Sequence, residues 1–199
     1  MTKEIKTIIF DYGGVICTTR RSELFANWIN QEYGIVKEDV LSQFDVGVWD
    51  DYNVGKSSAE ECYKVFQDLG IPLSIEELKN KFVSFGNPDP KMKELIQNLK
   101  SEGYDLAILS DSIPEFTEVV KYNFPNTFRV EVFSDEVKLR KPDPAIYDLT
   151  LERIGNLASE CLFIDDKEKN LVYPREIGIN VHLFRGIDGL VEDFKRYKC

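Results

Sequence analysis

Short apolar runs recur along the chain, each bounded by glycine, proline or polar residues. They cover residues 5–10, 106–109, 129–133, 161–164 and 180–184. Apolarity is nearly continuous in the first, second and fourth runs, which is typical of strands covered on both faces in a parallel sheet. The stretches with helical periodicity that separate the later runs cover 91–101, 115–121, 144–154 and 170–177. This alternation predicts a doubly wound α/β fold.

The interval between the first two strands is long and carries a different pattern. Residues 17–87 contain no convincing strand, and their helical periodicity covers 21–33, 37–44, 57–69 and 74–85. The Gly-Asn-Pro-Asp-Pro sequence at 86–90 marks the return to the sheet. We therefore predict an α/β core domain of residues 1–16 and 88–199, with residues 17–87 inserted as a helical domain.

Capping signals predict where several of these helices begin and end. Ser57 and Ser74 are the expected N-caps of two inserted helices, and Ser74 with Glu77 has the spacing of a capping box. Pro144 stands at the first position of a later helix, and Gly155 follows its last residue.

Composition narrows the range of functions. The 199 residues are 43% hydrophobic, which is enough to bury a core, and the formal net charge is −10. Such a charge disfavours general binding to nucleic acid or to a membrane surface, although a local pocket can still hold a small anion. Neither a spanning segment nor a signal peptide is visible. The four cysteines are scattered and only one histidine is present, which argues against a zinc site and a disulfide framework. We expect a cytoplasmic protein.

The first strand leads into the sequence Phe-Asp-Tyr-Gly-Gly-Val. Ligands of α/β folds bind outside the carboxyl ends of the strands, so Asp11 is placed for chemistry. Gly13 and Gly14 let the backbone approach an anion closely and offer consecutive N–H groups to it. The alternative is an ordinary strand-to-helix turn in which Asp11 caps the helix.

Polar residues also follow the second strand and precede a later helix. Ser110 ends the second strand, where its hydroxyl can bond a phosphate oxygen, although for Ser110 alone an ordinary helix-capping role is favoured. Lys141 precedes Pro142 in a segment that proline keeps extended, so it can neutralise an anion as a point charge. Lys138 and Arg140 are rivals for this role, but they fit a solvated basic face better.

The fourth strand ends in two adjacent carboxylates, Asp165 and Asp166. Such a pair at the end of a buried strand is costly unless a cation or hydrogen bonds compensate. A few oxygen ligands, with water completing the shell, are what Mg²⁺ prefers. Taken singly, either residue fits a solvated turn with Asp166 as a helix cap. The glycine-flanked carboxylate, the hydroxyl, the lysine and the carboxylate pair follow one another in this order along the chain. Chance is a poor explanation for four such residue types in these places.

In these features the chain resembles the haloacid dehalogenase superfamily, which consists mostly of Mg²⁺-dependent phosphatases. The residues that carry the resemblance are Asp11 in FDYGGV, Ser110 in ILSDS, Lys141 in RKPDP, and Asp165 with Asp166 in FIDD. The resemblance covers the whole chain, because the helical cap of that family is inserted at the same place. It implies a Rossmann-like sheet of order 3-2-1-4-5, which brings Asp11 beside the carboxylate pair.

The resemblance also implies a mechanism in which Asp11 and Lys141 are catalytic. Asp11 would attack the phosphorus of a small phosphorylated metabolite and form an aspartyl-phosphate that water hydrolyses. Mg²⁺ would be held by Asp11, the Gly13 carbonyl and Asp166, with Asp165 acting directly or through water. The residues that would hold the phosphate group are Ser110, Asp111, Gly13, Gly14 and Lys141.

One position departs from the pattern of that family. Most of its phosphatases carry a second aspartate two residues after the nucleophile as general acid and base, and here that residue is Gly13. General acid–base help contributes about 10²- to 10⁴-fold, so its loss matters. Some relatives with FDxGGV or FDxGNV resemble sugar-phosphate phosphatases despite this glycine. A good leaving group such as an anomeric hydroxyl needs less protonation. Asp50, Asp51 and Tyr12 are candidate substitutes, but a solvated face or a packed ring fits each better.

These observations favour a Mg²⁺-dependent phosphatase of small phosphomonoesters, with sugar phosphates as one such class. The alternatives are a catalytically idle protein that binds phosphate or a partner, and a hydrolase that uses Asp11 on carbon. The latter is disfavoured because attack on a C–halogen or C–O bond leaves the Asp165–Asp166 pair unexplained. We expect His182 to be a packed residue. Asn170 fits an orienting role and a helix surface equally well, and monomer and homodimer both remain open.

Overall fold

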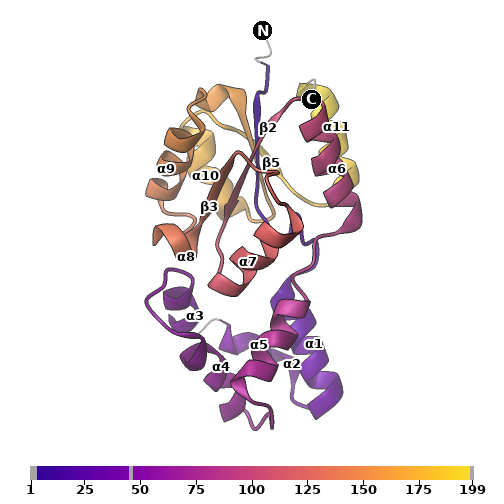
Figure 1. Ribbon diagram of the computed structural model, residues 1–199, viewed down its shortest axis with the longest axis vertical. Helices are drawn as coiled ribbons and strands as arrows, with labels where there is room; N and C mark the ends of the chain where they lie inside the picture. The colour runs from indigo at the N-terminus through magenta and orange to yellow at the C-terminus, as the bar shows by residue number, and fades with distance from the viewer. Residues whose placement is uncertain (1–3, 45–46, 198–199) are drawn as a thin grey trace.

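Five parallel strands form the centre of the protein in a computed structural model that describes residues 4–44 and 47–197. They are β1 (Thr7–Phe10), β2 (Asp105–Ser110), β3 (Val130–Phe133), β4 (Cys161–Asp165) and β5 (Asn180–Leu183). Their order is β3-β2-β1-β4-β5, which confirms the predicted topology (Figure 1). Phe10 pairs with Ile108 on one side and Ile164 on the other, so β1, β2 and β4 end at the same edge.

Helices cover both faces of this sheet (Figure 1). They are α6 (Pro90–Ser101), α7 (Pro114–Asn123), α8 (Ser134–Val137), α9 (Pro144–Ile154), the 3₁₀ turn η1 (Ala158–Glu160), α10 (Glu168–Glu176) and α11 (Ile187–Tyr197). Successive side chains of β1 point to opposite faces of the sheet, because the strand is pleated. Ile8 and Phe10 pack in the cluster of α6, α7 and α11, whereas Ile9 packs in the cluster of α9 and α10.

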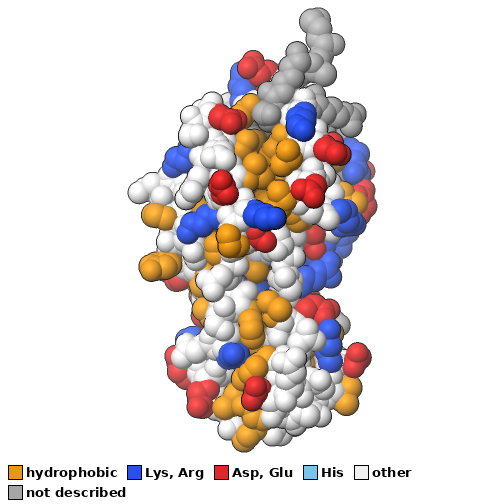
Figure 2. Space-filling view, turned by 90° about the vertical axis from the view of Figure 1, so that its right-hand side faces the viewer, with side chains coloured by type: hydrophobic (Ala, Val, Ile, Leu, Met, Phe, Trp, Pro, Cys, Tyr) orange, Lys and Arg blue, Asp and Glu red, His pale blue; other side chains and the backbone are white. Residues whose placement is uncertain are grey.

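Five helices form a second lobe, which we call the helical lobe. They are α1 (Arg21–Tyr33), α2 (Lys37–Gln43), α3 (Gly47–Tyr52), α4 (Ala59–Asp68) and α5 (Ile75–Ser84). The lobe has an aromatic core of its own around Phe25, Phe66 and Phe82, and Ile113 and Phe116 of the sheet domain enter it. The space-filling view shows two masses joined by a narrower waist (Figure 2).

The helix ends agree with the capping predictions at every position but one. Ser74 forms the predicted capping box with Glu77, and Pro144 and Gly155 flank α9 as expected. The prediction of Ser57 was wrong, because Ser58 is the N-cap of α4 and makes a capping box with Glu61. The Ser57 hydroxyl bonds the Glu61 carboxylate instead of a backbone amide, so it supports the box without capping the helix.

The structure adds three helices that the pattern did not reveal, α3, α8 and α11. The first two have six and four residues, too short for a helical period to show. In α11 the apolar residues Leu190 and Phe194 are spaced one turn apart and pack on the sheet. Among the helices of residues 4–44 and 47–197, none combines the length and the apolarity needed to cross a membrane.

Candidate active site

Three carboxylates meet where the two central strands end. Asp11 follows β1, Asp165 is the last residue of the neighbouring strand β4, and Asp166 follows it. One oxygen from each of the three lies within 4.8 Å of the others. All three side chains are at most 9% exposed, so their mutual repulsion is weakly screened by water. The sheet order therefore assembles the cluster that the sequence predicted.

Lys141 neutralises two of these carboxylates. Its Nζ lies 2.9 Å from Asp11 Oδ1 and 2.8 Å from Asp165 Oδ2, and it also donates to the Leu109 carbonyl at 3.1 Å. Its own backbone N–H donates to Asp111 Oδ1 at 2.9 Å, which fixes the backbone of this segment. The side chain is 2% exposed, so the lysine has a single well-defined position between the two strands.

Asp165 is satisfied by protein groups alone. Besides Lys141, it accepts hydrogen bonds from Asn170 Nδ2 at 3.0 Å to both of its oxygens. The Lys167 backbone N–H donates to Oδ1 at 2.8 Å. Asn170 is buried, which decides between the two interpretations of this residue: it orients Asp165 and is not on the helix surface. Asp165 is thus a positioning residue for Lys141 and for the site.

Asp166 keeps one oxygen without a protein partner. Its Oδ2 pairs with Arg20 at 2.8 Å, whereas its buried Oδ1 has no hydrogen-bond partner among the described residues. Gly14 gives it room, because a Cβ at that position would lie 2.6 Å from Asp166 Cγ. Gly14 also has φ +88°, a conformation that favours glycine.

Burial and charge determine the protonation of this cluster. Burial raises the pKa of Asp11 from its ordinary 3.8 to about 7, Lys141 opposes this rise, and Asp165 adds to it. Burial alone would lower the pKa of Lys141, but the two carboxylates outweigh it and raise that pKa above its ordinary value. The lysine is therefore a permanent cation beside a carboxylate that is costly to ionise.

Ser110 and Asp111, at the end of β2, differ in the hydrogen bonds that their side chains make. Ser110 is buried, and its hydroxyl makes only a long 3.3 Å contact with the Asp111 carbonyl, so it is free to rotate toward an incoming oxygen. The Asp111 carboxylate holds the Lys141 backbone in place. Its side chain therefore has a structural role, and the prediction that Asp111 binds phosphate rests on its backbone N–H alone.

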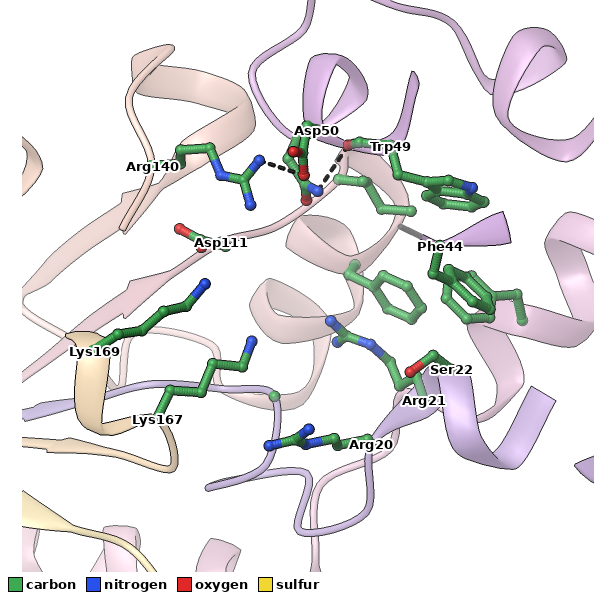
Figure 3. Close-up of a pocket in the computed structure, with 15 residues that line it drawn as sticks. Arg20, Arg21, Ser22, Phe44, Trp49, Asp50, Asp111, Arg140, Lys167 and Lys169 are labelled. Carbon is green, nitrogen blue, oxygen red and sulfur yellow. Dashed lines mark hydrogen bonds and ion pairs between the residues drawn. The ribbon is translucent and has the colours of Figure 1, made fainter. Parts of the chain in front are cut away.

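A cavity of about 470 Å³ opens between the sheet edge and the helical lobe (Figure 3). The cations that line it are Arg20, Arg21, Arg140, Lys167 and Lys169. Its aromatic wall comes from Phe44, Trp49, Phe82 and Phe116. In Figure 3 the ends of Lys167, Lys169 and Arg21 point into the same space, which Asp111 also faces. The lining thus combines a cluster of cationic side chains with an aromatic wall.

Comparison with known proteins agrees with this geometry. Residues 5–172 match the haloacid dehalogenase-like hydrolase family. The chain belongs to this family. It is a hydrolase, and the predicted resemblance is confirmed.

Two curated relatives of this haloacid dehalogenase-like hydrolase are sugar-phosphate enzymes. The D-ribitol-5-phosphate phosphatase of Bacteroides thetaiotaomicron is 30% identical over 188 residues, covering 87% of this chain and 89% of the relative. The phosphorylated carbohydrates phosphatase of Thermotoga maritima is 31% identical over 187 residues, covering 88% and 82%. A solved family enzyme of B. thetaiotaomicron, in complex with magnesium and inorganic phosphate, has a TM-score of 0.68 and 26% identity, covering 89% of this chain and 93% of that one.

Gly13, the residue that departs from the usual family pattern, lies close to Arg21. A Cβ at Gly13 would lie 3.6 Å from a terminal nitrogen of Arg21, so a guanidinium lies where a side chain at residue 13 would project. Sequence reasoning missed Arg21, because nothing in the pattern at the start of α1 points to the sheet. The guanidinium lies over the ring of Phe116, 3.7 Å from its centroid.

The three candidates for a substitute acid are not placed to act as one. The Tyr12 hydroxyl donates to the Gly86 carbonyl at 2.6 Å, and burial raises its pKa well above the ordinary value. Asp50 pairs with Arg140 across the waist, and Asp51 is exposed outside the cavity lining. His182 is paired with Asp193 at the 2.6 Å distance of a strong hydrogen bond, as a packed residue.

The carboxylate cluster fits a divalent cation. Oxygen donors alone form it, and the buried Asp166 Oδ1 lacks a partner that a cation would supply. A buried carboxylate oxygen without a donor is costly, so this atom is the observation that favours a metal.

Proposed function

We propose that this hydrolase is a Mg²⁺-dependent phosphatase of small phosphomonoesters, with sugar phosphates as the favoured class. The observation that carries the proposal is the cluster of Asp11, Lys141 and the unpartnered Asp166 oxygen. This cluster adjoins a cationic cavity, because Gly13, Arg20 and Lys167 line that cavity. The two sugar-phosphate relatives support the substrate class. The helical lobe is proposed as the cap, with residues 17–87 as its extent.

The residues that would hold Mg²⁺ are Asp11, Asp166 and the Gly13 carbonyl. The ion supplies positive charge that reduces repulsion between the Asp11 carboxylate and a phosphate dianion, both of which are anionic. Asp165 is already satisfied by Lys141 and Asn170, so its contribution would be to position the lysine.

Asp11, Lys141 and Ser110 account for the transfer of the phosphoryl group to the protein. Asp11 attacks phosphorus, a P–O bond to its carboxylate forms, and the bond to the leaving oxygen breaks with its electron pair staying on that oxygen. Lys141 favours the ionised form of Asp11 and meets the charge on the phosphoryl oxygens. Ser110 and the Gly13 N–H complete the hydrogen bonds of these oxygens. The prediction that Gly14 binds phosphate was wrong for its N–H, because this group already donates to the Cys17 carbonyl at 2.7 Å. Water then hydrolyses the aspartyl-phosphate and releases phosphate.

The leaving oxygen takes its proton from water, because no acid stands at residue 13. This favours esters of acidic alcohols, such as an anomeric hydroxyl, over simple alkyl phosphates. Closure of the helical lobe would exclude bulk water from the cavity while the phosphoryl group is on Asp11.

The test measures phosphate release from an aryl phosphate and a panel of sugar phosphates, with Mg²⁺ and with EDTA. The Asp11→Asn variant is the control, because an amide is a poor nucleophile of nearly the same size. We expect metal-dependent turnover that falls at least about a thousandfold in the variant. Turnover that survives EDTA would instead favour attack on carbon, and no turnover above Asp11→Asn on any ester would favour an idle phosphate-binding protein.

A further inference from the structure

Arg21 is a half-buried cation without an acceptor. It is the first residue of α1, and its guanidinium lies between the rings of Phe116, at 3.7 Å from the centroid, and Tyr12, at 5.8 Å. No described residue forms a hydrogen bond or an ion pair with it. Stacking on an aromatic face fixes the plane of a guanidinium but leaves its N–H donors unused. Donors that are held in place at a cavity and have no protein acceptor can bind an anionic ligand.

The guanidinium faces the substrate end of the cavity. It lines the same cavity as Gly13, and one of its nitrogens is 3.6 Å from the place of a Gly13 Cβ. Gly13 lies two residues beyond Asp11, so the Arg21 guanidinium is close to the place where a phosphoryl group would meet Asp11. The absence of a side chain at residue 13 leaves this path open.

The carboxylates of the site do not need this cation. Lys141 neutralises Asp11 and Asp165, and Arg20 pairs with Asp166. Arg140 is neutralised by Asp50 on the helical lobe. Arg21 therefore remains as positive charge in the cavity of a chain whose formal net charge is −10.

Lys169 adds to this charge from the opposite side of the cavity. It is exposed at the rim, and no described residue accepts a hydrogen bond from its ammonium group. Figure 3 shows its side chain directed into the space that Arg21 enters from the helical lobe. An exposed lysine is well solvated, so Arg21 is the residue that decides the argument and Lys169 supports it.

We propose that Arg21 selects phosphomonoesters whose leaving group carries a second acidic group, either a carboxylate or a second phosphate. The proposal rests on the phosphatase function proposed above and names the substrate class of the same site. A planar guanidinium matches both groups because it can donate two parallel hydrogen bonds to either. The scissile phosphate meets Asp11 and Lys141, and the second acid meets Arg21, with Lys169 beside it.

Matched substrates test this selectivity. Phosphoglycolate and ethylene glycol monophosphate differ only by a carboxylate in place of a hydroxymethyl group, as do 3-phosphoglycerate and glycerol 3-phosphate. Glucose 1,6-bisphosphate against glucose 1-phosphate provides the second-phosphate arm. We expect kcat/KM of the wild-type protein to favour the acid in the carboxylate pairs, or the bisphosphate in the sugar pair, by about 10- to 100-fold, the range of a charge-assisted hydrogen bond.

Three variants separate recognition from other roles of the arginine. In Arg21→Gln the acid-to-alcohol ratio should fall to about one, and in Arg21→Lys it should fall only in part, because charge remains but the planar pair of donors is lost. Arg175→Gln is the matched control: this arginine pairs with Glu168 on α10 outside the cavity lining, and the ratio should stay at the wild-type value. A wild-type ratio near one in all pairs overturns the proposal. So does an Arg21→Gln variant that slows both members of a pair equally, because the arginine would then serve the phosphoryl group or the leaving oxygen.

Binding without turnover distinguishes failure of this inference from failure of the proposed function. Titration calorimetry with the Asp11→Asn variant measures the affinity for phosphoglycolate and for ethylene glycol monophosphate, with and without Arg21→Gln. A preference for the acid that depends on Arg21 supports the inference even if the wild-type protein hydrolyses nothing. Equal affinity for the two, or binding of neither, overturns it whatever the outcome of the phosphatase assay.

Discussion

At the scale of single residues, the lysine between two carboxylates is the strongest test of the site. Lys141→Met leaves Asp11 and Asp165 buried without their cation, which costs about 3–5 kcal/mol of unfolding free energy. The folded-state pKa of Asp11, about 7, already lies above its ordinary value, and losing the lysine raises it further. The folded protein then binds protons that the unfolded chain does not, so stability falls as pH rises through this range.

We therefore expect Lys141→Met to be more destabilising at pH 8 than at pH 5.5. Urea unfolding in EDTA at both pH values measures this, with Lys121→Met as the control. Lys121 forms an exposed pair with Glu136, so its loss should cost less than about 1 kcal/mol at either pH. An equal penalty for Lys141→Met at the two pH values would show that its role is packing rather than charge.

The same scale shows what the sequence could and could not predict of the site. Asp11, Lys141 and Asp166 were predicted because their places depend on where strands end and on proline, both of which are local signals. Arg21 was not, because its position depends on the ring of Phe116, which comes from a helix distant in the sequence. Asn170 stayed ambiguous because helical periodicity does not distinguish a buried amide that orients Asp165 from a surface one.

At the scale of elements, the start of α4 tests whether a cap depends on one particular serine. The Ser58 hydroxyl accepts from the Glu61 N–H at 3.3 Å, and the Glu61 carboxylate accepts from the Ser58 N–H at 2.9 Å. We expect Ser58→Ala to lower the free energy of unfolding by about 1 kcal/mol, and Ser57→Ala by about a few tenths, because Ser57 reaches only a side chain. Urea unfolding of the two variants measures both losses of unfolding free energy. An equal loss would place the start of the helix one residue earlier.

The elements themselves differed in how well the sequence predicted them. All five strands were predicted to within two residues at each end. For β1, β2 and β4 the reason is that strands buried on both faces read as nearly continuous apolar runs. The helix α3 was missed because it begins at Gly47 and spans only six residues, and packing of Trp49 and Tyr52 in the helical lobe stabilises it. Such short helices depend on tertiary contacts that no local pattern contains.

At the scale of the whole molecule, Phe116 joins the two lobes. It belongs to α7 of the sheet domain, yet its ring packs in the helical-lobe core, 5.2 Å from the ring of Phe82. It also lies against the waist, because a Cβ at Gly86 would come within 2.7 Å of it. The apolar contact between the lobes therefore includes this buried side chain, its neighbour Ile113 and the partly buried Val119.

Removing this ring should loosen one lobe more than the other. Phe116→Ala deletes a buried aromatic side chain, which costs about 3–5 kcal/mol, and the cavity that it leaves lies in the core of the helical lobe. Hydrogen exchange followed by mass spectrometry should show faster exchange in α1–α5 than in the strands, because local opening exposes the less stable unit first. Phe124→Ala is the matched control, since Phe124 is equally buried but packs on Phe128 in the sheet-domain core. Its loss should speed exchange around α6 and β2 instead. Identical exchange patterns in the two variants would mean that the two lobes open as one cooperative unit, so that the helical lobe does not move independently of the sheet domain.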